Sequence, residues 1–321
     1  MTLLVALADK KRAVLLADRR MSSGSVVLDD EYNKVTVFAC EDARLAVAFT
    51  GLATFGNFNT SEWLTQTLSD ICETTLSIHS ILPEFEIRAG ATFGALTAND
   101  RRVTFLFSGF VHFGSVAEPR IYTVSNFEYG SHAPGIFSTN SLGDPKQSAV
   151  VTAGMTSALP DSTTQSLYKL FAADLPSAAI VRFTVKHLQH AAKSVRSLNQ
   201  IGEHCTAAII SCQTNTSIIT TYHTPKHSLK AFGPSIVIGN RRTVFGTEVV
   251  ASSILAGPEI RKKDPCWCGS GLTFKHCHLK KFGGIYARHS AWNKPLTPFQ
   301  RVDIGTPWAT GRYFVVWGGY E

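Results

Sequence analysis

The chain has 321 residues, of which 44% are hydrophobic and 17% are charged, and its formal net charge is +7 at pH 7. This composition is typical of one large globular core with a small appendage, and it excludes an intrinsically disordered chain. No apolar run approaches the roughly 18 to 20 residues of a membrane-spanning helix, and the first residues lack the basic segment and long apolar run of a signal peptide. We therefore expect a cytoplasmic protein without a membrane partner.

The first 34 residues predict three short strands separated by polar breaks. Apolar runs cover residues 2–7 and 13–17, with a polar segment of hairpin length between them, and a turn at 22–24 precedes a third run at 25–28. Asp18 stands at the end of the second run, and Lys34 follows an acidic cluster. Met1 is usually removed before a small residue such as Thr. We therefore expect Thr2 to carry both a nucleophilic hydroxyl and a free amine.

The remaining chain mixes strand and helix patterns. Two strands are expected first, and the second runs into Gly51, where a glycine lets a backbone N–H closely face a substrate. Ser61 is the expected N-cap of the first helix. In chain order, the strands are expected at 34–38, 43–49, 102–113, 119–124, 149–154 and 205–212, and the helices at 57–77, 83–96, 163–173 and 177–197. The residues alone indicate an α+β fold with many strands.

The positive charge belongs to the C-terminal third of the chain. Residues 213–321 contain 14 Lys/Arg and 5 Asp/Glu, whereas residues 1–212 contain 17 and 19 of the chain totals of 31 and 24. Such an excess favours an anionic partner, nucleic acid or an acidic protein face, and it equally fits a role in solubility alone. The charge distribution is compatible with both interpretations.

Residues 264–278 contain a compact set of metal ligands. The spacing is C-x-C, then eight residues, then C-H, which gives Cys266, Cys268, Cys277 and His278. Four soft or borderline donors suit tetrahedral Zn²⁺, and a Cys₃His set leaves no open position for a substrate. The Gly-Ser-Gly between the two halves allows a tight turn. The pattern therefore predicts a structural Zn²⁺ site.

The same stretch resembles the SEC-C motif, found at the C-terminus of SecA and in many unrelated proteins. The likeness rests on the Asp-Pro-Cys-x-Cys-Gly-Ser-Gly text and on the Lys-x-Cys-His ending; Leu272-Thr273 departs from it, because basic residues are common there. The resemblance implies a small basic docking unit for a ribosome, a nucleic acid or a protein. We expect a main domain over 1–256, this module over 257–281 and an aromatic, Gly-rich tail over 282–321.

The N-terminal stretch resembles the proteasome β-type family of N-terminal nucleophile (Ntn) hydrolases, which includes the HslV peptidases. Counted from Thr2, both Asp18 and Lys34 fall at the family's intervals for its catalytic Asp and Lys, and Gly51 matches the glycine of its oxyanion hole. The resemblance implies a four-layer αββα sandwich with Thr2 as the nucleophile and a peptide or other amide as the substrate. It also implies a homo-oligomer, because relatives form rings.

Two departures affect the residues that support the terminal threonine in that family. Met155 or Thr156 stands where the family has a serine, and Leu198 and Ile201 lie nearest the places of its Asp and of a second Ser. Two functions therefore stay open. One is an N-terminal threonine amidohydrolase, a peptidase whose zinc module docks a partner or substrate. The other is a catalytically degenerate scaffold that acts as a zinc-dependent adaptor for protein or nucleic acid.

Overall fold

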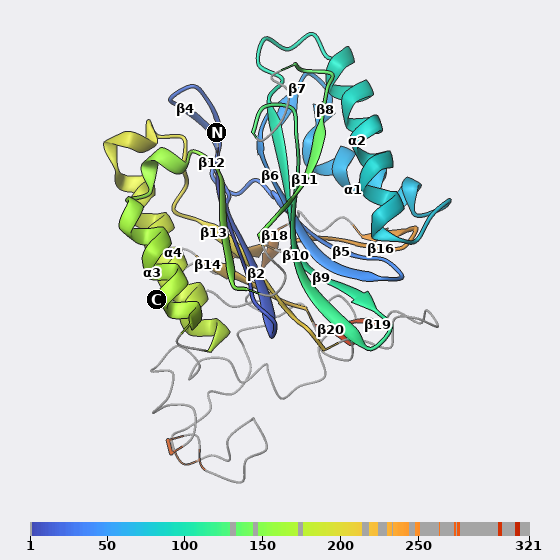
Figure 1. Ribbon diagram of the computed structural model, residues 1–321. Coiled ribbons are helices and arrows are strands. Elements are labelled where there is room, and N and C mark those ends of the chain that lie inside the picture. The colour runs from blue at the N-terminus through green and yellow to red at the C-terminus, as the bar shows by residue number, and fades with distance from the viewer. Residues whose placement is uncertain are drawn as a thin grey trace.

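The computed structural model describes residues 2–128, 133–143, 147–172, 176–213, 218–223, 230–232, 234–243, 248–250, 263, 273, 275–276, 301–303 and 312–314. Within these residues the chain is a mixed α/β structure with two large sheets (Figure 1). The expected boundaries at 256/257 and 281/282 fall outside the described residues, so the division into three parts stays a prediction.

The first sheet carries the N-terminal hairpin at its centre. All of its neighbouring strands are antiparallel. The hairpin turn is closed by Asp9, whose side chain accepts from the backbone N–H groups of Lys11 and Arg12. Leu4 is paired with Ala17 in this hairpin, so the next residue of β2, Asp18, lies beside Leu3. The strand order is β12 (Ala149–Gly154), β1 (Leu3–Ala8), β2 (Arg12–Asp18), β13 (Cys205–Ser211) and β14 (Ile219–His223).

The second sheet has seven strands. Among its described strands, only β16 and β5 run parallel to each other. Its order is β11 (Ser138–Leu142), β10 (Val116–Ser125), β9 (Val103–Phe113), β6 (Ala43–Gly51), β5 (Val35–Ala39), β16 (Ser235–Ile238) and β17 (Arg241–Thr243). Short two-stranded ribbons join β3 (Met21–Ser23) to β4 (Val26–Asp29), β7 (Thr54–Phe55) to β8 (Phe58–Asn59), β15 (Lys230–Phe232) to β18 (Glu248–Val250), and β19 (Arg301–Asp303) to β20 (Arg312–Phe314).

The two sheets face each other, and helices cover their outer faces (Figure 1). Alternate residues of β1 explain why its apolar run is unbroken: Leu4 and Ala6 pack between the sheets, whereas Leu3 and Val5 pack against the helical side. The outer face of the first sheet is covered by α3 (Asp161–Ala172) and α4 (Ser177–Lys193), and that of the second by α1 (Thr60–Ile71) and α2 (Ile78–Ala95). Short 3₁₀ turns lie at Thr156–Ala158 and Val195–Ser197.

The helix starts differ from those expected because the capping groups differ. The N-cap of α1 is Asn59, whose side chain accepts from the N–H groups of Ser61 and Glu62, so Ser61 was the wrong cap. The start of α2 lies five residues before Pro83, at Ile78, whose N–H donates to the Asp42 carboxylate at 2.8 Å. This cap comes from the turn between β5 and β6, so the local sequence gives no sign of it.

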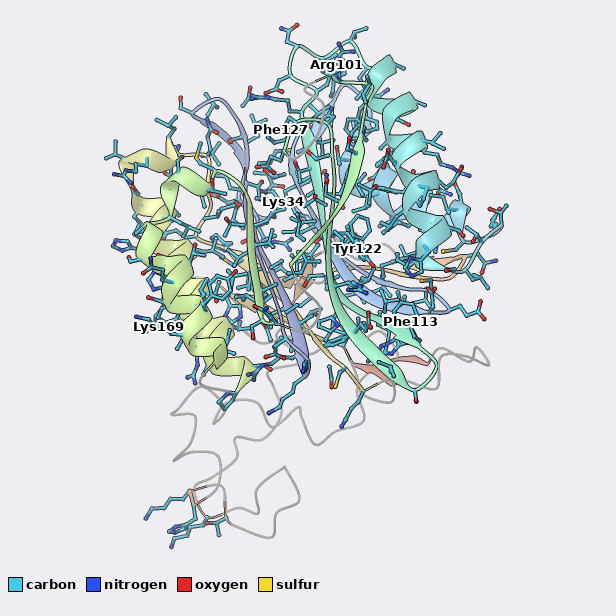
Figure 2. All side chains as sticks on the ribbon, in the orientation of Figure 1. Lys34, Arg101, Phe113, Tyr122, Phe127 and Lys169 are labelled. Carbon is cyan, nitrogen blue, oxygen red and sulfur yellow. The ribbon has the colours of Figure 1, made fainter. Side chains whose placement is uncertain are left out.

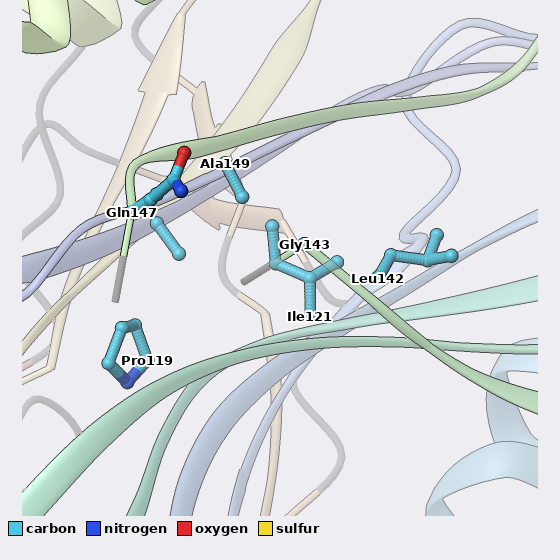
Figure 3. A pocket seen from close by; sticks show the side chains of 7 residues that line it. Pro119, Ile121, Leu142, Gly143, Gln147 and Ala149 are labelled. Atoms are coloured by element: carbon cyan, nitrogen blue, oxygen red, sulfur yellow. The ribbon is translucent and has the colours of Figure 1, made fainter. Parts of the chain in front are cut away.

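A small cavity lies between the sheets at the end of β1 that is remote from Thr2 (Figure 3). Its volume is about 10 Å³, which is room for about one water molecule. The lining residues are Ala8, Pro119, Ile121, Leu142, Gly143, Gln147 and Ala149. The cavity is therefore too small for a substrate. Among the described residues, no helix has the length and apolar character to cross a membrane.

Candidate functional site

The structure brings Thr2, Asp18 and Lys34 together between the two sheets. Thr2 precedes β1, Asp18 ends β2, and Lys34 precedes β5 of the other sheet. The Lys34 Nζ lies 2.5 Å from Thr2 Oγ1 and 3.3 Å from Asp18 Oδ1. All three are nearly inaccessible, with exposed fractions of 3%, 0% and 2%. Figure 2 shows Lys34 in the interior, between the strands of the two sheets.

The Asp18 carboxylate is fixed by three backbone donors. Oδ2 accepts from the N–H of Leu3 at 2.8 Å, and Oδ1 accepts from Arg20 at 2.9 Å and Gly202 at 3.0 Å. The backbone therefore fixes the position of this carboxylate, and its Oδ1 faces Lys34 Nζ.

Lys34 is a buried base whose charge is only partly compensated. Burial lowers the pKa of Lys34, the Asp18 carboxylate raises it again in part, and the nearby Arg19 guanidinium lowers it further. The ammonium also donates to the backbone carbonyl of Arg20. Lys34 Nζ therefore donates to three acceptors: Asp18 Oδ1, the Arg20 carbonyl and Thr2 Oγ1.

The backbone of Thr2 is held by residues from both sheets. Its N–H donates to Thr50 Oγ1 at 3.1 Å, and its carbonyl accepts from the Thr50 hydroxyl at 3.2 Å and from the Met155 N–H at 2.9 Å. Thr50 is not among the site residues that the sequence predicts, although it is the neighbour of Gly51. The only local signal is a hydroxyl residue directly before the glycine that ends a strand.

Two glycines are required by close backbone approaches at this site. Gly154 has φ +84°, and a Cβ on it would lie 1.9 Å from the Thr2 carbonyl oxygen and 2.7 Å from Thr50 Oγ1. Gly51 has φ +105°, and a Cβ there would lie 2.0 Å from the Arg102 carbonyl oxygen. The structure places Gly51 directly after Thr50, but its oxyanion role stays a prediction.

Of the positions that depart from the resembled family, Met155 and Ile201 are apolar and buried, whereas Thr156 and Leu198 are exposed. Met155 and Ile201 pack in the cluster beneath α3 and α4, with exposed fractions of 6% and 0%. The polar side chains next to Ile201 are engaged elsewhere, because Glu203 pairs with Lys193 at 3.0 Å and His204 Nδ1 lies 2.7 Å from the Tyr222 hydroxyl. Neither departure therefore supplies Thr2 with a side-chain hydrogen bond.

A second polar network lies beside the Asp18–Lys34 pair. Arg19 is 1% exposed, and burial lowers its pKa to about 10. It faces Glu31, whose pKa is raised by burial and whose carboxylate accepts from the Tyr222 hydroxyl at 2.8 Å. The Arg19 N–H also donates to the His204 carbonyl. This network fixes the chain directly after Asp18.

The predicted zinc ligands Cys266, Cys268, Cys277 and His278 lie outside the described residues. Within the described part of the chain, no group of three or more His, Cys, Asp or Glu side chains is placed to hold a metal ion.

Comparisons with known proteins identify a motif in this chain and solved structures that are similar to it. Residues 263–280 match the family model of the SEC-C motif, so the motif expected at the C-terminal end is confirmed. A solved structure similar to this chain is the Anbu (Gly-1) mutant from Hyphomicrobium sp. strain MC1. It has 14% sequence identity and a TM-score of 0.45, and the match covers 66% of this chain and 83% of that one. A likeness at this level carries no conclusion about fold or activity.

Proposed function

We propose that this protein is an N-terminal threonine amidohydrolase of the peptidase type, built on the four-layer αββα sandwich of the Ntn hydrolases. One observation carries the proposal: Lys34 Nζ lies 2.5 Å from Thr2 Oγ1, in a buried site where Asp18 compensates the ammonium. These residues come from three separate strand ends, two in one sheet and one near the other. Lys and Asp side chains are rarely buried unless they are paired, and burying such a pair is costly. The burial of Asp18 and Lys34 beside the Thr2 hydroxyl therefore supports a role for both.

The mechanism begins with removal of Met1, which converts the Thr2 N–H into a free amine. The amine has an ordinary pKa of about 7.7–8.0, so it can accept a proton near neutral pH. It takes the proton of the Thr2 hydroxyl while Oγ1 forms a bond to the substrate carbonyl carbon. Lys34 favours this step in two ways: it stabilises the developing charge on Oγ1, and its positive charge lowers the pKa of the amine.

Collapse of the tetrahedral intermediate completes the acyl transfer. The Gly51 N–H is the proposed donor to the oxyanion. The carbon–nitrogen bond breaks, the ammonium of Thr2 returns its proton to the leaving amine, and an ester on Thr2 remains. Water then attacks the ester carbonyl carbon while the Thr2 amine accepts its proton; the acyl carbon–Oγ1 bond breaks, the amine returns the proton to Oγ1, and the carboxylic acid product leaves. Peptides and other amides are the substrates that this sequence of steps fits.

The C-terminal module is the proposed docking element. Its donor set of three thiolates and one imidazole fits a structural Zn²⁺ held by Cys266, Cys268, Cys277 and His278. The match to the SEC-C motif supports this assignment. Bound zinc would fix the fold of the module, and the basic residues around it would attract an acidic partner, which we propose to be a protein, a ribosome or a nucleic acid.

A second candidate function is a degenerate scaffold that acts as a zinc-dependent adaptor. It is favoured by the apolar side chains of Met155 and Ile201 and by the low exposure of Thr2. One experiment separates the two. Intact mass establishes whether Met1 is absent, and a β-lactone probe that acylates nucleophilic hydroxyls is then applied to the wild type, to Thr2→Ser and to Thr2→Ala. An amidohydrolase loses Met1 and forms an ester that Thr2→Ala cannot form. Retained Met1, or equal labelling of Thr2→Ala, would exclude the amidohydrolase and leave the adaptor as the remaining candidate.

A further inference from the structure

Glu128 lies at this site but has no part in the mechanism above. It follows β10, and the segment around it is fixed by the buried Asn126, whose side chain accepts from the Val103 N–H at 2.8 Å and donates to the Arg101 carbonyl at 2.8 Å. The Glu128 N–H donates to Ser125 Oγ at 2.8 Å. The position of the half-buried Glu128 side chain is therefore set by the second sheet.

The carboxylate of Glu128 is separated from Thr2 by a single glycine. Its Oε1 accepts from the Gly154 N–H at 2.8 Å. The other side of Gly154 rests on Thr2 and Thr50, because a Cβ there would collide with the Thr2 carbonyl and contact Thr50 Oγ1. Thr50 Oγ1 is also the acceptor for the Thr2 N–H. The amino end of Thr2 and the Glu128 carboxylate therefore belong to one cluster around Gly154.

One oxygen of this carboxylate is unused. Oε2 of Glu128 is buried, and within the described part of the chain it has no hydrogen-bond partner. Buried polar atoms are nearly always satisfied, so an orphaned carboxylate oxygen indicates that a donor is missing. Burial also raises the pKa of Glu128; the Gly154 N–H lowers it in part, and so does the nearby Thr104 hydroxyl, which is itself hydrogen-bonded to Ser125 Oγ at 2.7 Å. A nearby cation would relieve both costs.

The free amine of Thr2 is the donor that fits. An ammonium group has three N–H donors, and the Thr50 hydroxyl accepts one of them. Met155 and Ile201, the residues at the family's supporting positions, offer only apolar side chains. We infer that Glu128 Oε2 accepts a hydrogen bond from the α-amino group of Thr2 once Met1 has been removed. Glu128 is then a positioning residue that acts through the amine, and this inference rests on the proposed function.

This role has a consequence for the protonation of the amine. A carboxylate next to an ammonium raises the pKa of the ammonium, whereas Lys34 lowers it. Glu128 and Lys34 therefore shift the pKa of the Thr2 amine in opposite directions. The hydrogen bond to Glu128 orders the amine, and the opposing effect of Lys34 keeps its pKa low enough for it to exchange a proton. Loss of the negative charge at Glu128 should lower the pKa of the Thr2 amine.

The test measures that pKa directly in the full chain beginning at Thr2, prepared by cleaving an N-terminal fusion. The wild type and Glu128→Gln are labelled with acetic anhydride across a pH series, and acetylation of the N-terminal peptide is followed by mass spectrometry. Gln keeps the acceptor for the Gly154 N–H and removes only the charge. The matched control is Glu86→Gln, a half-buried carboxylate on α2 that accepts from Thr139 Oγ1 at 2.6 Å.

Glu128→Gln is expected to lower the amine pKa by about one unit, so that acetylation below this pKa becomes about tenfold faster. Glu86→Gln should leave it unchanged. An unchanged profile in Glu128→Gln, or equal shifts in both variants, would overturn the inference. Failure of the proposed function gives a different result, because it appears as absence of Thr2 acylation by the β-lactone in the wild type. The amine pKa is measured whether or not that acylation occurs.

Discussion

Replacement of Asp18 by Asn tests whether the buried Asp18–Lys34 pair organises the site. Asn has nearly the same shape but carries no charge and has only one acceptor oxygen. Both oxygens of Asp18 are used, since Oδ2 binds the Leu3 N–H and Oδ1 binds the N–H groups of Arg20 and Gly202. An amide in either orientation therefore leaves at least one buried N–H facing an NH₂ group.

The size of the effect follows from burial. Leaving one buried donor unsatisfied costs about 1–3 kcal/mol, and removing one partner of a buried ion pair costs about 3–5 kcal/mol. The two costs are not added in full, because the pKa of Lys34 is already lowered by burial and an unpaired Lys34 can lose its proton, which removes the uncompensated charge. We therefore expect Asp18→Asn to lower the free energy of unfolding by about 3–5 kcal/mol.

Lys34→Met is the informative counterpart. It leaves Asp18 with its three backbone donors, so the remaining charge is still solvated by the chain. Its cost should be smaller, about 1–3 kcal/mol. The double variant should cost less than the sum of the two single ones, because the two residues interact directly.

Urea unfolding followed by circular dichroism measures all four proteins. The ranking should persist at high salt, since a buried pair is only weakly screened. A cost below about 1 kcal/mol for Asp18→Asn, or a larger cost for Lys34→Met, would refute the reasoning.

Three further predictions concern a backbone approach, a titrating group and the metal. Gly154→Ala should destabilise the fold in urea unfolding by more than the roughly 1–2 kcal/mol that a positive φ alone costs, and it should abolish Thr2 acylation. The control is Gly24→Ala, at φ +59° with no atom within 4 Å of a Cβ, which should show only the backbone cost. In a chain that retains Met1, where no Thr2 amine faces Glu128, burial raises the pKa of Glu128 above its ordinary 4.5. The stabilising contribution of the protonated carboxyl is then complete below pH 4.5 and is lost as the pH rises, so Glu128→Gln should gain stability relative to the Met1-retaining wild type over that rise, and parallel pH profiles would contradict this. Bound zinc, measured by elemental analysis, should be stoichiometric in the wild type and lost in Cys277→Ser but not in Cys212→Ser.

The sequence by itself determined the elements whose causes are local. The unbroken apolar runs of β1 and β2, with a polar turn between them, fix the hairpin, and its register then places Asp18 beside Leu3. The spacing of Cys266, Cys268, Cys277 and His278 defines the SEC-C motif without any tertiary contact. Apolar runs and ligand spacing depend only on residues that are close in the sequence, so both can be predicted from the sequence alone.

Only the tertiary structure decided which groups surround Thr2. Thr50 and Met155 contact Thr2 from distant strands, and Gly202 reaches Asp18 across 184 positions of sequence. Asp42 caps α2 in the same way, which moved its start from the expected position to Ile78. Such contacts depend on the pairing of strands that are far apart in the sequence and on the packing of helices and sheets against one another, and no local pattern records either. The intervals of Asp18 and Lys34 nominated the site, and the packing of the sheets gave it its geometry.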